Sequence, residues 1–245
     1  IHSYRSDGRE SPGYVAAAAR GIGLDFMAVT DHHLYAPSLE AQQAFDGVKI
    51  DLRIYPGEEV HPPGNPVHMI NFGGRFSLNE MFSGNTYWAE VQALQDRLGP
   101  LSPGVDPYQY ASCCWCFDRI RQAGGLGIFC HPYWFCESRY YATFEEVDFL
   151  LRHSSFDAIE LGNYRIPRMA MLNAKLMELA REIGFCKPYI GASDWHARPG
   201  QAADIASTII FAKSPSFGDF ADAVRSGRCV AVGGSRDAFP FGSLR

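Results

Sequence analysis

The stretch LDFMAVTDHH, residues 24–33, contains the pattern that decides the fold: an apolar run of strand-forming residues ends in side chains able to bind a metal ion. The pattern returns in LRIYPGEEV (52–60), LGIFCHP (126–132) and YIGASDWH (189–196). Each run is short enough to be a strand, and each ends in a carboxylate or a histidine. We therefore expect strands whose carboxyl ends carry the chemistry of the protein.

Segments with helix start and stop signals separate these strands. Ser11 and Pro12 are typical of an N-cap and a first helical turn, and Gly21 ends that helix. Thr143, with Glu146 three residues later, predicts a capping box at the start of another helix. Strands and helices that alternate at this spacing favour a parallel sheet covered by helices.

The number of strand–helix units and the absence of nucleotide motifs decide between two α/β architectures. Roughly seven units, with no G-x-G-x-x-G and no P-loop, favour a closed or distorted TIM-like barrel over a Rossmann sheet. No internal repeat interrupts the chain, so we treat residues 1–245 as a single domain. Residues 75–110 are irregular apart from an expected helix at Tyr87–Leu98, and we interpret them as an insertion or a lid.

Charge and cysteine content narrow the class of protein. The net charge of −5 argues against a nucleic-acid-binding surface. The seven cysteines form no regular framework, which indicates mostly free thiols in a reducing compartment. We interpret Cys113, Cys114 and Cys116 as buried thiols on a helix, because this C-C-x-C cluster lacks the paired C-x2-C knuckles of a zinc site. No apolar run approaches the ~20 residues of a membrane span. We expect a cytoplasmic protein without nucleic-acid or membrane partners; export is left open because the sequence begins at Ile1.

Residue types that bind metal ions gather at the predicted strand ends. In chain order they are His2, Asp7, Asp31, His32, His33, Glu58, Glu59, His68, His131, Asp194 and His196. Because the carboxyl ends of parallel strands in a barrel meet on one face, we expect these segments to converge there. His, Asp and Glu without ligand-like Cys are typical of Zn²⁺, Mn²⁺ or Fe²⁺ in a hydrolytic centre, where a carboxylate such as Glu59 can bridge two ions.

The order of these motifs resembles the polymerase and histidinol phosphatase (PHP) family. IHSYRSDG, VTDHH, PGEEV, VHMINFG, CHPYW and GASDWH follow the family's H-x-H-S-x-x-S-D-G, T-D-H, G-x-E, H, H-P and S-D-x-H, from residue 1 to about 212. The resemblance implies a distorted (β/α)7 barrel with two or three divalent ions at its C-terminal face. The first histidine of H-x-H would precede Ile1.

Carried over residue by residue, the resemblance implies three groups of metal ligands. They are His2 with Glu59 and Asp194; Glu59 with His68 and His131; and Asp7 with His32 and His196. Glu59 is then the shared ligand, and Glu58 is not one. We interpret His33 and His61 as rim or turn residues.

Several further residues are candidates for catalysis or substrate binding. Asp31 is either an orienter of His32 or the proton acceptor for the attacking water, and a turn cap is an equally good interpretation. When an ester bond is hydrolysed, the oxygen that leaves needs a proton, and His196 and Asp31 are the candidates to supply it. Arg198 and Arg165 follow strand ends and could hold a phosphate, and Asn163 could contact substrate or hold a ligand in place.

Three functions remain open at this stage. The leading one is a phosphoesterase that cleaves a phosphorylated small molecule, either a monoester or a diester. The second is a carboxylic ester, amide or carbamate hydrolase with the same metal site, which an apolar pocket would favour. The third is a non-catalytic PHP module of a larger protein, against which the nearly complete ligand set argues. The sequence predicts neither the metal, nor the substrate, nor the oligomeric state.

Overall fold

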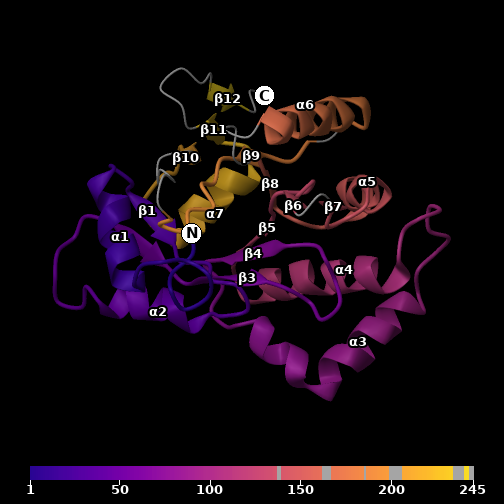
Figure 1. Ribbon diagram of the computed structural model, residues 1–245, viewed down its shortest axis with the longest axis horizontal. Coiled ribbons are helices and arrows are strands. Elements are labelled where there is room, and N and C mark those ends of the chain that lie inside the picture. Colours follow the sequence, from indigo (N-terminus) through magenta and orange to yellow (C-terminus); the bar gives the residue numbers. More distant parts are fainter. Residues whose placement is uncertain (137–138, 162–166, 185, 199–205, 234–239, 243–245) are drawn as a thin grey trace.

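The computed structural model describes residues 1–136, 139–161, 167–184, 186–198, 206–233 and 240–242. Strands and helices alternate along much of the chain, and the helices pack around a set of short sheets (Figure 1). The helices are α1 (Pro12–Gly21), α2 (Ala36–Gln43), the 3-10 helix η1 (Asn79–Ser83), α3 (Asn85–Gln95), α4 (Pro107–Gln122), α5 (Phe144–His153), α6 (Pro167–Glu182) and α7 (Phe217–Arg225).

The strands form a mixed α/β arrangement. They are β1 (Phe26–Ala28), β2 (Arg53–Tyr55), β3 (Gly57–Val60), β4 (Met69–Phe72), β5 (Leu126–Phe129), β6 (Phe135–Cys136), β7 (Arg139–Tyr140), β8 (Ala158–Glu160), β9 (Tyr189–Ile190), β10 (Ala206–Ile210), β11 (Cys229–Gly233) and β12 (Pro240–Gly242). The largest sheet has the order β3-β4-β5-β8-β9, β1 pairs with β2, and β10-β11-β12 form a third sheet. Within the described residues the strand pairings do not close into a ring, so the barrel stays a prediction.

The expectation of an all-parallel sheet is wrong for part of the chain. β5, β8 and β9 are parallel, as are β1 and β2, but β4 runs antiparallel to both β3 and β5. Only residues 61–68 connect β3 to β4, and a parallel crossover needs a dozen residues or more. The stretch 52–60, expected as one strand, divides at Pro56 into β2 and β3, which pair with different partners.

The helix signals in the sequence are confirmed at several ends. Ser11 caps α1 by accepting from the backbone N–H of Tyr14, and Thr143 and Glu146 form the capping box of α5. The expected helix at Tyr87–Leu98 is α3, which begins two residues earlier and ends three residues earlier. Caps depend on residues within one helical turn, so the sequence alone is enough to place them.

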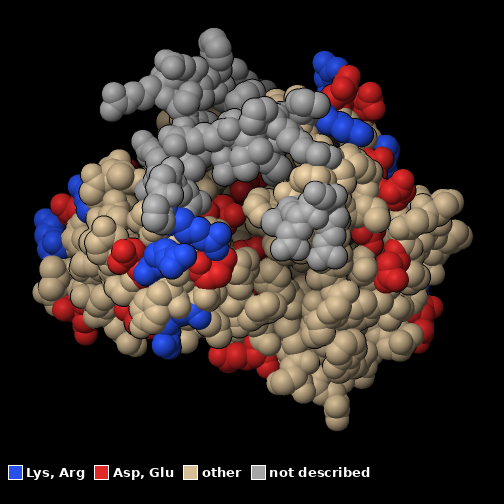
Figure 2. Space-filling model, viewed as in Figure 1, with Lys and Arg blue, Asp and Glu red and all other residues tan. Residues whose placement is uncertain are grey.

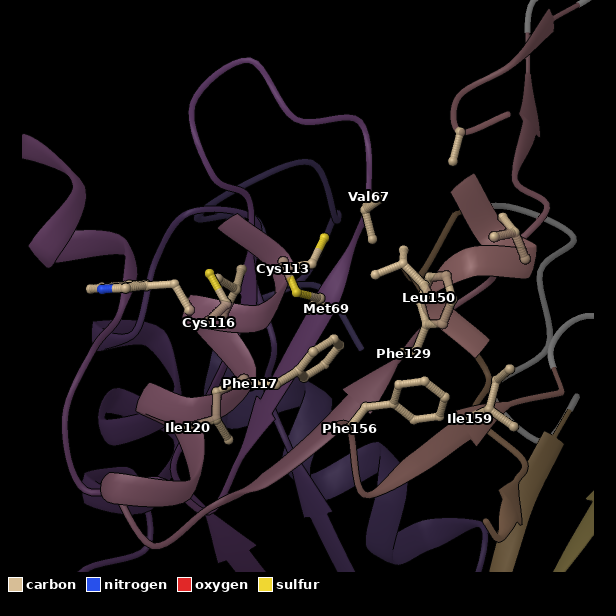
Figure 3. Close-up of a cluster of buried hydrophobic side chains, with 14 of the residues drawn as sticks. Val67, Met69, Cys113, Cys116, Phe117, Ile120, Phe129, Leu150, Phe156 and Ile159 are labelled. Atoms are coloured by element: carbon tan, nitrogen blue, oxygen red, sulfur yellow. The ribbon is translucent and has the colours of Figure 1, made fainter. Parts of the chain in front are cut away.

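A large core lies between α4 and the strands β4, β5 and β8 (Figure 3). Phe117 and Ile120 of α4 meet Phe129 of β5 there, with Phe156 beside them. Cys113 and Cys116 are fully buried in the same core, in agreement with the interpretation of thiols on a helix, and burial raises the pKa of both. This core holds β4 and β5 in place, and with them the loops at their ends.

Part of the segment 75–110 packs onto this core. Tyr87 of α3 and Phe82 of η1 contact Trp115 of α4. The indole N–H of Trp115 also donates to Glu90 at 2.7 Å. These contacts fasten α3 to α4, and the function of the segment as a lid stays a prediction. No helix among the described residues is both long and apolar enough to cross a membrane.

Candidate metal centre

Glu59 lies at the centre of the predicted ligand set. Its carboxylate is 1% exposed, and its two oxygens face different groups of histidines. Oε2 is 3.1 Å from His2 Nε2 and 3.2 Å from His32 Nδ1. Oε1 is 3.0 Å from His68 Nδ1 and 3.5 Å from His131 Nε2. The two oxygens of this one carboxylate therefore have separate sets of histidine neighbours.

The strand β3 separates the roles of the two neighbouring glutamates. Side chains alternate along a strand, so Glu58 points away from Glu59. The buried Glu58 carboxylate accepts hydrogen bonds from Asn71 Nδ2, Ser77 Oγ and Asn79 Nδ2, at 2.9, 2.7 and 2.9 Å, and from the backbone N–H of Leu78. Glu58 therefore holds the start of the segment 75–110 against β3, consistent with its exclusion from the ligand set.

His2 and Asp194 complete one group on the Oε2 side of Glu59. His2 Nε2 is 3.0 Å from Asp194 Oδ1, and the backbone N–H of His2 donates to the carbonyl of Trp195 at 2.8 Å. Asp194 has a φ of 47°, a left-handed conformation that Asp adopts more readily than most residues. Burial would raise the pKa of the Asp194 carboxyl, but the hydrogen bond with His2 outweighs it and lowers that pKa.

Asp7, His32 and His196 form a second group beside the first. Asp7 Oδ2 is 3.2 Å from His196 Nε2, and Asp7 Oδ1 is 3.6 Å from His32 Nε2. The SDG turn that carries Asp7 needs Gly8, because a Cβ at that position would lie 2.4 Å from the backbone oxygen of His2. The imidazole of His2 stacks on that of His196 with ring centroids 4.3 Å apart, which joins the two groups.

His32 reaches Glu59 because their backbones pair. The two residues form an isolated parallel bridge in which the N–H of Glu59 donates to the carbonyl of Asp31 and the N–H of His33 donates to the carbonyl of Glu59. The chain then turns at His33, whose φ is 61°. The end of the β1 segment is thereby set directly against β3, although 27 residues separate the two in sequence.

Asp31 is fully buried and its carboxylate contacts the N-terminal loop. Oδ1 accepts from the backbone N–H groups of Ser3 and Ser6 at 2.9 and 3.2 Å and from the Ser6 hydroxyl, while Oδ2 accepts from the Ser3 hydroxyl at 2.7 Å. That loop carries His2 and Asp7. The geometry favours a residue that positions these ligands over one that takes a proton from water.

The arrangement suits divalent cations. The predicted ligands comprise the histidines 2, 32, 68, 131 and 196 and the carboxylates 7, 59 and 194, so with neutral histidines the centre carries excess negative charge. Nδ1 of His2 and Nδ1 of His131 are buried with no hydrogen-bond partner among the described residues. Two atoms bound to one ion at ~2.1 Å lie roughly 3.0–3.4 Å apart. The distances from His2 Nε2 to Glu59 and to Asp194, 3.1 and 3.0 Å, are close to that spacing. The ions themselves stay a proposal.

The sequence did not predict the places of three residues near the centre: His61 was expected on a rim or turn, and Glu160 and Cys130 were not candidates. His61 Nε2 lies 2.9 Å from His32 Nδ1 and 3.6 Å from Glu59 Oε1, so His61 is inside the cluster and not on a rim. Glu160 Oε2 accepts from the backbone N–H of His131 and lies 3.4 Å from its Nδ1. Cys130 Sγ is 4.0 Å from Glu59 Oε1. Glu160 is the last residue of β8, and a carboxylate at a strand end is a signal that could have identified it.

The candidate substrate residues divide into described and undescribed ones. Arg198 Nη2 donates to Asp7 Oδ2 at 2.7 Å, which places a cation beside the second ligand group. Asn163 and Arg165 lie outside the described residues. His196 Nδ1 is 2.7 Å from the carbonyl oxygen of Asp194 and donates to it, so Nε2 faces Asp7 with its lone pair. A lone pair in that direction favours a ligand role for His196 over that of a proton donor.

The surroundings of the centre include an aromatic side and a cavity. Trp134 lies 5.2 Å from His131 and Tyr141 lies 6.1 Å from His68, both between ring centroids. A cavity of about 490 Å³ lies between β1 and β10, has a mainly apolar lining, and reaches His2, Glu59 and Asp194. On the face drawn in Figure 2, the described basic side chains lie among acidic ones and not in one extended patch.

Comparisons with known proteins bear on the fold. No family model and no curated protein matches this sequence. A two-domain protein of Bacteroides vulgatus that contains a predicted PHP-like metal-dependent phosphoesterase is similar, with a TM-score of 0.61 and 16% identity over 94% of this chain. This chain spans 62% of that protein.

A candidate metal-dependent phosphoesterase of Bifidobacterium adolescentis is also similar. Its TM-score is 0.54, with 20% identity over 81% of this chain and 87% of that protein. At such identities the likeness shows the fold alone, and the activity of either protein is not carried over by it. The chain therefore has a mixed α/β fold that is similar to the folds of two proteins described as predicted or candidate metal-dependent phosphoesterases, one of them PHP-like.

Proposed function

We propose that this chain is a metal-dependent hydrolase that cleaves a phosphate mono- or diester of a small molecule. The observation that carries the proposal is Glu59, whose two oxygens face two separate groups of histidine nitrogens at 3.0–3.5 Å. A buried carboxylate between two sets of imidazole nitrogens is an arrangement that could hold two ions close together. The group of Asp7, His32 and His196 would hold a third.

The protein's own residues would prepare this centre in defined ways. Burial would raise the pKa of the Glu59 carboxyl, but hydrogen bonds from His131, His2 and His68 lower it, so the carboxylate is ionised and ready to bind. Divalent ions, when bound, supply Lewis acidity and lower the pKa of water. Arg198 lies beside Asp7, where its guanidinium can orient a phosphate oxygen.

The proposal is tested with the protein loaded in turn with Zn²⁺, Mn²⁺ and Fe²⁺. Phosphate monoesters, phosphate diesters, carboxylic esters and amides are offered to each form. We expect hydrolysis of a phosphate ester, abolished in Glu59→Ala and in His131→Ala and retained in the matched controls Glu145→Ala and His153→Ala, whose side chains lie on α5. Circular dichroism checks that each variant is folded.

Each other outcome decides against the proposal in its own way. Near-wild-type turnover of Glu59→Ala with saturating Mn²⁺ would show that the site is assigned wrongly. Turnover of carboxylic esters alone would favour the second candidate, which the apolar lining of the cavity beside His2 supports. Fewer than one bound ion per chain, with no turnover, would support a non-catalytic module.

A further inference from the structure

We infer that His61 positions His32. Nε2 of His61 accepts a hydrogen bond that the N–H at His32 Nδ1 donates, and this fixes the tautomer in which the unprotonated Nε2 of His32 faces Asp7 and His196. This inference deepens the proposed function, because it takes the centre to bind divalent ions. It concerns a histidine that the sequence motifs do not include. It also assigns a definite proton to a definite atom, which makes it testable without a substrate.

The geometry between the two rings is that of a hydrogen bond. Nδ1 of His32 and Nε2 of His61 are 2.9 Å apart, within the normal range for an N–H donor and a ring nitrogen. The rings cross at 65°, with centroids 4.9 Å apart, so one nitrogen points at the other and the rings do not stack. The side chain of His61 is only 12% exposed, so little water competes for this contact.

The other nitrogen of His32 is directed to the second ligand group. His32 Nε2 lies 3.6 Å from Asp7 Oδ1, and Asp7 also contacts His196 Nε2. A histidine that binds an ion through one ring nitrogen almost always donates from the other, and the acceptor fixes its tautomer and orientation. If Nε2 of His32 is the ligand atom, Nδ1 must carry the proton and needs an acceptor.

Two acceptors lie near Nδ1 of His32, and one of them has other partners. Glu59 Oε2 is 3.2 Å away, but His2 Nε2 approaches the same oxygen at 3.1 Å. If His2 and Glu59 hold an ion, Oε2 would be engaged by that ion and would be a weaker acceptor for a further hydrogen bond. His61 Nε2, at the shorter distance of 2.9 Å, then remains as the acceptor.

The backbone around His61 is held firmly enough to support this role. The N–H of His61 donates to Asn79 Oδ1 at 3.2 Å, and Asn79 Nδ2 donates to the carbonyl of Glu59 at 2.9 Å and to the Glu58 carboxylate at 2.9 Å. Asn79 thus clamps both ends of the stretch 59–61. The start of the segment 75–110 is thereby coupled to the orientation of His61 and, through it, of His32.

The test compares two substitutions of His61 that differ only in whether an acceptor remains. In His61→Gln the amide oxygen can take the place of Nε2, whereas His61→Leu has no acceptor. His153→Leu is the matched control, because His153 is an exposed histidine at the end of α5. Zn²⁺ affinity is measured by titration against a competing chelator, and bound zinc per chain by elemental analysis.

We expect one class of zinc site to weaken about 10- to 100-fold in His61→Leu, with affinity restored in His61→Gln to within about threefold of wild type. His153→Leu should bind zinc as wild type does. In ¹⁵N–¹H spectra of the zinc-loaded wild type, His32 should carry its proton on Nδ1. That signal should persist in His61→Gln and be lost to solvent exchange in His61→Leu.

Three results would overturn the inference. Equal loss of one zinc ion in His61→Gln and His61→Leu would make His61 a direct ligand. Wild-type affinity in both would mean that His61 does not act on His32, and a His32 proton on Nε2 would reverse the assigned tautomer. None of these readings needs turnover: a zinc-loaded protein with the expected tautomer but no phosphate ester hydrolysis would refute the proposed function and leave the role of His61 standing. A protein that binds none of Zn²⁺, Mn²⁺ and Fe²⁺ would refute both.

Discussion

Replacing Asp31 separates a positioning role from a role in proton transfer. Asp31→Asn keeps the size of the side chain and removes its charge, whereas Asp31→Ala removes the acceptors as well. If Asp31 only holds the loop that carries His2 and Asp7, the asparagine variant should keep most of the hydrolytic activity. If Asp31 accepts a proton from water, both variants should be equally inactive.

The hydrogen bonds of Asp31 set the size of the effect on stability. Two backbone N–H groups, of Ser3 and Ser6, donate to Oδ1 in a buried site. A hydrogen bond to a charged group contributes about 1.5–3 kcal/mol, so Asp31→Ala should lower the free energy of unfolding by about 3–6 kcal/mol. The serine hydroxyls can rotate to other partners, and we add nothing for them.

Asp31→Asn should be much milder. Its Oδ1 can still accept from both N–H groups, and its Nδ2 can donate to the Ser3 hydroxyl. Each of the two bonds weakens to the range of a neutral pair, about 0.5–1.5 kcal/mol, so the loss should be about 2 kcal/mol. Urea unfolding of the metal-free protein measures both values.

Turnover with saturating metal completes the comparison. We expect Asp31→Asn to retain activity within about tenfold of wild type and to bind metal normally, and Asp31→Ala to bind metal weakly. The reasoning is refuted if Asp31→Asn is as stable as expected and fully loaded with metal, yet as inactive as Asp31→Ala. In that case the carboxylate takes part in proton transfer.

Three further predictions concern the turn, the pH and the ions. Gly8→Ala should destabilise the fold by about 2 kcal/mol or more and weaken metal binding, because its Cβ would meet the backbone of His2. Gly21→Ala, whose Cβ meets nothing within 4 Å, is the control, and urea unfolding measures both variants. Equal stability of the two variants would contradict this prediction. Burial lowers the pKa of His2, but hydrogen bonds with Asp194 and Glu59 outweigh it and raise that pKa to about 9. The folded value lies above the ordinary 6.5, so protonated His2 stabilises the metal-free fold fully below about pH 6.5, and this is lost as the pH rises through 9. Metal affinity needs the neutral ring and should rise over the same window; calorimetric titration that shows a flat profile would contradict the assignment. Finally, a chelator should lower the midpoint of thermal unfolding and added divalent ion should restore it, whereas an unchanged midpoint would argue against bound ions.

Local patterns in the sequence were enough to predict the elements and most of the cluster. The caps of α1 and α5 depend on contacts within one turn, and both are confirmed. The segments that end in His2, His32, Glu59 and Asp194 do meet, because short strands side by side bring their ends together. Whether these residues bind metal stays a proposal.

Tertiary structure decided the features that depend on contacts between distant segments. The pattern of side chains along a strand is the same in either direction, so the pattern in β4 does not show that this strand runs antiparallel to β3 and β5. The short connection 61–68 limits the direction of β4 relative to β3, but only the folded structure places β5 beside it. His61 was interpreted as a rim or turn residue because no local signal distinguishes such a histidine from one that faces His32, 29 residues away.

The sequence by itself determined which chemical groups are present and at which end of each strand they stand. It could not determine which atom of each group faces which partner. Oε1 and Oε2 of Glu59 are chemically equivalent in the chain, and only the packing of β3 against β4 and the β1 segment gives them different neighbours. The ligand atoms that we propose are therefore properties of the folded arrangement, since contacts between atoms depend on distances that sequence spacing does not set.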